Sequence, residues 1–171
     1  INLPLKAYIF TDSIGSSTGL LAMIFLMFVG ASPGSTGGGI KTSTLFALIQ
    51  GIKTAATNTS GKAFHYSVPH GVFRKASVIA VMGISVIAVG TFMLCAFEPD
   101  IAIRDALFEM TSAFGTVGLT TGITTGLCTA SKLTSIVMMY IGRLGPLTIA
   151  TLWYFTNGDR IKYPDGNIAI G

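Results

Sequence analysis

The residues from Ala76 to Phe97 form an apolar run of 22 residues without a single charged side chain. At about 1.5 Å per residue, a helix of this length is roughly 33 Å long, enough to cross a bilayer core of about 30 Å. A second apolar run, from Leu133 to Phe155, contains one charge, Arg143. Only 11% of the residues are charged, whereas a soluble domain has about 25%. The sequence therefore predicts an all-α membrane protein.

The charged residues lie between the apolar segments. Positive charges are concentrated in residues 53–75 and in residues 157–171, while residues 98–132 carry four acidic residues against two basic ones. The positive-inside rule places the first two stretches in the cytoplasm and residues 98–132 outside. Because the basic residues bracket apolar spans and do not gather on one face with aromatics, nucleic-acid binding is not expected.

A turn rich in glycine follows a short helix-like segment, residues 103–113, that is too short to cross a membrane. The C-terminal end of such a helix carries about half a negative charge, which favours a cation at the turn. Gly118 can adopt the positive φ that turns backbone carbonyls toward an ion, and rings of carbonyls can replace an ion's hydration shell. The order of span, short helix, turn and span predicts a pore repeat.

A stretch of small residues, Gly30 to Gly39, separates two apolar segments near residues 14–31 and 40–52. Irregular backbone at membrane depth is tolerated only inside protein or beside a water-filled cavity, so we interpret the stretch as a break within one helix. The alternative is a plain turn between two helices of a hairpin. A hairpin would place Lys53 on the same side as residue 13, against the charge pattern.

Two other functions are compatible with parts of the chain. A secondary carrier would bind its substrate at the broken helix, residues 30–42. A membrane-bound nucleotide-binding protein would use residues 34–42, although Ile40 separates the last glycine from Lys41 and the pattern of a phosphate-binding loop is missed. No Ser/His/Asp set, paired carboxylates or metal-ligand spacing is apparent, so an enzyme is not expected.

Arg143 lies ten residues after Leu133 and twelve before Phe155, in the middle of the predicted last span. A charge at that depth usually faces a cavity or a partner group. An arginine that snorkels to the membrane surface is the alternative, and the mid-span position argues against it. We expect Arg143 to face the loop of residues 30–44 across the pore.

Three motifs, in order, resemble the Trk/Ktr potassium-transporter superfamily. Residues 111–119, TSAFGTVGL, resemble its fourth pore loop; residues 30–42, GASPGSTGGGIKT, resemble the broken second helix of its third repeat; residues 141–146, IGRLGP, resemble its arginine-bearing last helix. The C-terminal residues 160–171 are similar to the end of the Ktr-type membrane pore subunit. The resemblance covers nearly the whole chain.

The resemblance implies a potassium-channel-like pore of four helix–pore loop–helix repeats, with one broken helix in this chain. Residues 1–56 would be the second half of repeat three and contain the intramembrane loop 30–44. A cytoplasmic linker, residues 57–71, would lead to repeat four at 72–156, followed by a cytoplasmic tail at 157–171. Repeat four would comprise helix 72–97, pore helix 103–114, filter 115–119 and helix 133–155.

The resemblance also implies the roles of individual residues. K⁺ would bind the backbone carbonyls of Thr116, Val117 and Gly118. The whole filter would consist of Gly115, Thr116, Val117, Gly118 and Leu119. The gate would consist of Gly30, Ser32, Gly34, Ser35, Thr36, Gly37, Gly38, Gly39, Lys41 and Arg143.

The implied function is K⁺ uptake across the cell membrane, with Na⁺ as a candidate activator and no cofactor in this chain. The implied partners are the remaining repeats of the same pore, a second copy in a homodimer, a cytoplasmic nucleotide-binding regulatory ring and the lipid bilayer. The protein would be a multi-pass protein of a bacterial cell membrane with a cytoplasmic C-terminus. Because the chain begins at Ile1-Asn2 and holds one such pore loop, we expect it to be part of a longer protein.

Overall fold

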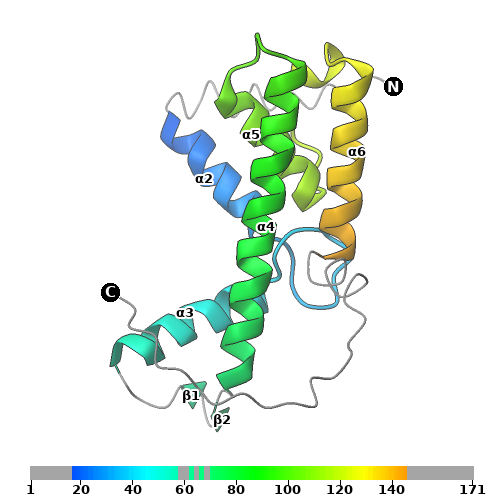
Figure 1. Ribbon diagram of the computed structural model, residues 1–171. Helices are drawn as coiled ribbons and strands as arrows, with labels where there is room; N and C mark the ends of the chain where they lie inside the picture. Colours follow the sequence, from blue (N-terminus) through cyan, green and yellow to red (C-terminus); the bar gives the residue numbers. More distant parts are fainter. Residues whose placement is uncertain (1–16, 58–61, 64–65, 68–69, 146–171) are drawn as a thin grey trace, which may run out of the picture.

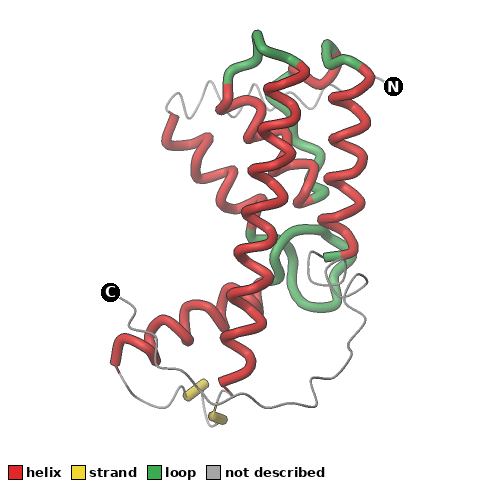
Figure 2. The backbone as a smooth tube through the Cα atoms, in the orientation of Figure 1, coloured by secondary structure: helices red, strands yellow, loops and turns green. Residues whose placement is uncertain are grey.

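The computed structural model describes residues 17–57, 62–63, 66–67 and 70–145. These residues are mostly helical (Figures 1 and 2). The helices are α2 (Ser17–Phe28), α3 (Thr42–Thr57), α4 (His70–Phe97), α5 (Ile103–Gly115) and α6 (Thr129–Leu144), with a short 3₁₀ turn, η1 (Ile123–Thr125). Two-residue strands, β1 (Lys62–Ala63) and β2 (Tyr66–Ser67), pair antiparallel within residues 57–71, the segment that was expected to be a linker.

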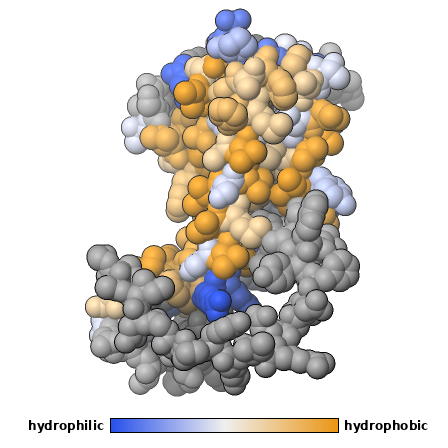
Figure 3. All heavy atoms as spheres, in the orientation of Figure 1, coloured by the Kyte–Doolittle hydropathy of each residue, from blue (hydrophilic) through white to orange (hydrophobic). Residues whose placement is uncertain are grey.

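Helix α4 contains the long apolar run. Within the described residues it is the one helix long and apolar enough to cross a membrane, over Val72–Phe97. Many of its apolar side chains are exposed, including Val81 (63%) and Phe92 (75%). Figure 3 shows apolar residues over much of the visible surface of the upper part of the molecule. Such a surface suits lipid or further membrane-embedded protein.

The break between α2 and α3 spans residues 29–41, so α2 ends three residues before the expected position. Val29 and Ile40 form an isolated parallel bridge. The Gly30 N–H donates to the Ile40 carbonyl (2.7 Å), and the Ile40 N–H donates to the Phe28 carbonyl (3.0 Å). These hydrogen bonds hold the two ends of the loop together, and α2 therefore ends at Phe28. Helix α3 then continues to Thr57, beyond the expected end at Ile52.

Helix α6 differs most from the expected 133–155. It begins at Thr129, where the Cys128 thiol accepts a hydrogen bond from the Ser131 N–H (3.5 Å). It ends at Leu144, because Gly145 adopts a positive φ of 84° and its N–H donates to the Ile141 carbonyl. Arg143 therefore lies in the last turn of a helix and not in its middle. Residues 146–171, including the rest of the expected span and the tail, lie outside the described residues.

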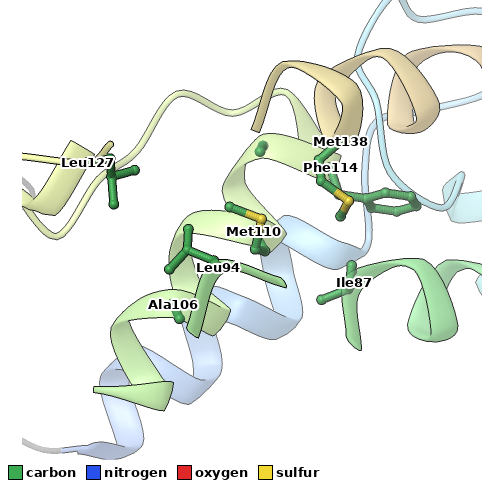
Figure 4. Close-up of a cluster of buried hydrophobic side chains, with 8 residues drawn as sticks. Ile87, Leu94, Ala106, Met110, Phe114, Leu127 and Met138 are labelled. Atoms are coloured by element: carbon green, nitrogen blue, oxygen red, sulfur yellow. The ribbon is translucent and has the colours of Figure 1, made fainter. Parts of the chain in front are cut away.

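Helix α5 lies in the upper part of the molecule, packed against α2, α4 and α6 (Figure 1). Every residue from Phe108 to Gly115 is buried, although the helix is too short to span a bilayer. The Phe114 ring stacks on Phe28 of α2, with centroids 6.3 Å apart. Figure 4 shows Phe114 and Met138 side by side at the end of α5. The core cluster consists of Ile87, Leu94, Ala106, Met110, Ala113, Phe114, Leu127 and Met138.

Candidate ion filter and intramembrane loop

Helix α5 ends in a tight reversal at Thr116. The Thr116 backbone is left-handed (φ 53°), and Thr116 is the only described residue other than glycine that has a positive φ. The Thr116 N–H donates to the Ala113 carbonyl and the Val117 N–H to the Ser112 carbonyl, both at 3.0 Å. These two bonds form a Schellman motif, which closes the last turn. The negative end of the α5 dipole therefore points toward the start of the predicted filter.

The two glycines of the predicted filter have different structural roles. Gly118 has a φ of +82°, and a Cβ added there would have no atom within 4 Å, so backbone conformation alone demands glycine. This is the positive φ expected from the sequence. Gly115 is the last helical residue, and a Cβ there would lie 2.6 Å from the Met27 carbonyl oxygen. Gly115 is thus required for close packing against α2.

Three segments far apart in the sequence meet at the carbonyl of Phe114. A Cβ added to Gly38 would lie 2.6 Å from the Phe114 oxygen, and a Cβ added to Gly142 would lie 1.9 Å from the same atom. The Gly38 N–H also donates to the Thr116 hydroxyl (2.9 Å), across 78 positions of sequence. The glycine-rich loop, the end of α5 and the end of α6 therefore touch through their backbones, directly before the predicted filter.

The loop itself has an exposed tip and a buried base. Residues 32–36 are exposed, whereas residues 38–40 are buried. The Lys41 ammonium donates to the carbonyls of Gly37 (2.6 Å) and Ser35 (3.1 Å) and so closes the loop on itself. A phosphate-binding lysine would point at its ligand, and a phosphate loop follows a strand, whereas this loop follows helix α2. The geometry therefore counts against the nucleotide-binding alternative.

Arg143 is exposed and makes no hydrogen bond or ion pair with any residue that the structure describes. Its neighbour Gly142 is buried against Phe114, so Arg143 lies beside the region where the loop meets α5. The contacts with the loop that were expected of Arg143 are made by Lys41. These two hydrogen bonds of Lys41 were not predicted. The ammonium reaches carbonyls four and six residues earlier, and whether it can do so depends on the path of the loop.

Glu109 was also missed as a functional candidate. It is 8% exposed and accepts hydrogen bonds from the segment after the filter. The sequence did contain a signal, a second acidic residue in the short helix after Asp105, followed by a threonine-rich return. Within the described ranges, no group of three His, Cys, Asp or Glu residues could hold a metal ion.

Replacing Gly142 by alanine tests the backbone contact at Phe114. A methyl group 1.9 Å from a carbonyl oxygen cannot be accommodated without shifting α6 or α5, and we expect a loss of roughly 1–3 kcal/mol in stability, as for overpacked cores. Gly83→Ala is the matched control, since its Cβ would make ordinary contacts at 3.4–3.5 Å in α4. The melting temperature of the purified protein should fall for Gly142→Ala only, and equal melting temperatures would contradict the close approach.

Comparison with known proteins places the chain in a family. The family model described as "TrkH: Cation transport protein" matches residues 12–161. The chain is 36% identical over 149 residues to Ktr system potassium uptake protein B of Bacillus subtilis (strain 168), a match that covers 86% of this chain and 33% of that protein. It is 36% identical over 163 residues to the potassium/sodium uptake protein NtpJ of Enterococcus hirae, covering 91% and 36%.

A third relative, Ktr system potassium uptake protein B of Vibrio alginolyticus, is 37% identical over 153 residues, or 89% of this chain and 33% of that protein. The chain thus spans about a third of the length of the relatives it matches. The family match extends from before α2 to beyond α6 and includes the loop and the turn that meet at Phe114. This chain is a membrane protein that belongs to the TrkH cation transport protein family.

Proposed function

We propose that this chain contributes a carbonyl filter and an intramembrane gate to a transporter that takes up K⁺ across the cell membrane. The filter would be residues 115–119, with K⁺ at the carbonyls of Thr116, Val117 and Gly118. The gate would be residues 30–44 together with Arg143. The names of the relatives point to potassium, and in one case to sodium as well. K⁺ is the transported ion in this proposal, and Na⁺ is a candidate activator.

The observation that carries the proposal is the meeting of the loop with the end of α5. The buried short helix ends in a reversal that leads directly into the positive-φ glycine, Gly118. The loop base lies against the last carbonyls of that helix and bonds to Thr116. A glycine loop in this position would lie on the path of an ion leaving the filter, and it consists of residues small enough to move aside.

The remaining parts of the proposal rest on the resemblance and on charge placement. The chain would provide the second half of one helix–pore loop–helix repeat and the whole of the next, and the relatives' additional length leaves room for further repeats. A homodimer, a cytoplasmic nucleotide-binding ring and a cytoplasmic C-terminus complete the proposed assembly. The positive-inside pattern of residues 53–75 and 157–171 supports the orientation.

Ion flux through the full-length protein tests the function. Reconstituted in liposomes, it should take up K⁺ or Rb⁺ down a gradient and prefer K⁺ to Na⁺. Empty liposomes treated in the same way are the control. Absence of K⁺-dependent flux would contradict the proposal. Flux of an organic solute that is blocked by substitutions in residues 30–42 but not in residues 115–119 would favour a secondary carrier instead.

A further inference from the structure

Glu109 is a buried acidic residue of helix α5. It lies on the second-last turn of α5, between the fully buried residues Phe108 and Met110, and is 8% exposed. A carboxylate taken out of water is strongly destabilising unless hydrogen-bond donors replace the lost water. The partners of Glu109 therefore indicate what the residue stabilises.

All the partners of the Glu109 carboxylate come from the segment just after the predicted filter. One carboxylate oxygen, Oε1, accepts from the Thr120 hydroxyl and from the Thr121 N–H (3.1 Å). The other oxygen, Oε2, accepts from the Thr124 hydroxyl (3.1 Å). The Gly122 N–H in turn donates to the Thr120 hydroxyl (2.9 Å), which extends the network around the turn. One side chain thus holds residues 120–124 against the back of the short helix.

The filter segment lies between this network and a second attachment. At its start, Thr116 is held by the Schellman motif and by the N–H of Gly38. Gly118 and Leu119 make no hydrogen bond to any other described residue. Carbonyls that are to coordinate an ion cannot also bond to neighbouring backbone. The conformation of Gly118 and Leu119 is therefore determined by what fixes residues 116 and 120.

We propose that Glu109 is a positioning residue for the ion filter. It does not touch the ion; it fixes the far end of the filter, so that the carbonyls of Thr116, Val117 and Gly118 keep a constant spacing. This inference rests on the proposed filter function. A carboxylate suits the task because its two oxygens can accept the several donors of a tight turn at once, and charge-assisted hydrogen bonds are stronger than neutral ones.

Glu109→Ala in the full-length protein tests the proposal. It removes all three hydrogen bonds and leaves the Thr121 N–H without an acceptor. We expect the half-saturating K⁺ concentration to rise about tenfold and the K⁺/Na⁺ preference to fall by a similar factor, because several charge-assisted bonds are lost. The maximal rate per transporter should change much less. Uptake of K⁺ and of Na⁺ at graded concentrations, normalised to the amount of protein in the membrane, measures both quantities.

Two matched variants separate positioning from general stability. Glu109→Gln keeps an acceptor oxygen for Thr120 and Thr121. Its half-saturating K⁺ concentration and its K⁺/Na⁺ preference should therefore stay within about threefold of the parent values. Thr121→Val should have parental affinity and preference, because its buried hydroxyl has no partner among the described residues and its N–H is retained. If Glu109→Ala does not reach the membrane, the double variant Thr120→Val/Thr124→Val removes the two hydroxyl donors and should show the same loss of preference.

A merely structural role would lower K⁺ and Na⁺ uptake together and leave their ratio unchanged, and that result would overturn the proposal. A Glu109→Gln variant as impaired as Glu109→Ala would overturn it as well. The Gly118→Ser variant shows whether only the positioning role of Glu109 is wrong or whether the filter assignment is wrong as well. If Gly118→Ser alters the K⁺/Na⁺ preference and the Glu109 variants do not, the filter assignment stands and the positioning role is wrong. If neither alters it, the filter assignment fails too.

Discussion

Gly118→Ser in the full-length protein is expected to raise the half-saturating K⁺ concentration about tenfold and to weaken discrimination against Na⁺, with normal insertion into the membrane. The φ of Gly118 is +82°, and a left-handed conformation costs a residue with a side chain about 1–2 kcal/mol. A Cβ there would meet no atom within 4 Å, so no clash adds to this strain. The backbone can relieve the strain by rotating, and rotation turns the filter carbonyls away from the ion.

Gly126→Ser is the control for this substitution. Gly126 lies in the same return segment, but its φ is −83° and the nearest atom to a Cβ would be the Ile123 oxygen at 3.6 Å. Gly126→Ser should therefore have the K⁺ affinity and the Na⁺ discrimination of the parent protein. Uptake assays in cells that lack their own K⁺ transporters would give the K⁺ affinity and the Na⁺ competition. Parental affinity and parental Na⁺ discrimination in Gly118→Ser would count against a filter at this position.

Deleting residues 33–35 from the tip of the loop is expected to increase K⁺ flux severalfold, up to about tenfold for a barrier lowered by about 1.4 kcal/mol. Residues 33–35 are exposed, whereas the base of the loop at residues 38–40 is buried, with Gly38 against the end of α5. The deletion therefore removes the tip of the proposed gate and one of the two carbonyls that accept from Lys41, while the hydrogen bond from Gly38 to Thr116 remains. A deletion variant with normal expression and unchanged or lower flux would refute the gate.

Arg143→Ala provides a second test of the same barrier. The arginine adds a positive charge next to the contact between Gly142 and Phe114, and cations leaving the filter would have to pass it. Its removal alone should increase flux. Combined with the loop deletion it should add little, because both changes act on one barrier and neighbouring effects are not additive. Fully additive increases would indicate that Arg143 acts separately from the loop.

Several features followed from the sequence because they depend on local physics. A run of 22 uncharged apolar residues predicts a membrane-length helix, and α4 contains that run. A short helix-like segment followed by glycines predicts a helix that ends there, and α5 ends at Gly115. Gly118 was expected to have a positive φ, and it does. In each case the decisive property, hydrophobic length or the missing Cβ, belongs to the residues themselves.

The contacts that make up the candidate site were decided by tertiary structure. Nothing local distinguishes Gly38 and Gly142, which must lack a side chain to reach the Phe114 carbonyl, from Gly118, which needs its backbone freedom. Three other features likewise depend on the path of neighbouring segments. They are the end of α6 at Leu144, the hydrogen bonds from Lys41 to the loop carbonyls, and those that Glu109 accepts from residues 120–124. A sequence shows that a residue is small, apolar or charged, but its partner is selected only when distant segments pack and each buried polar group must find a donor or an acceptor.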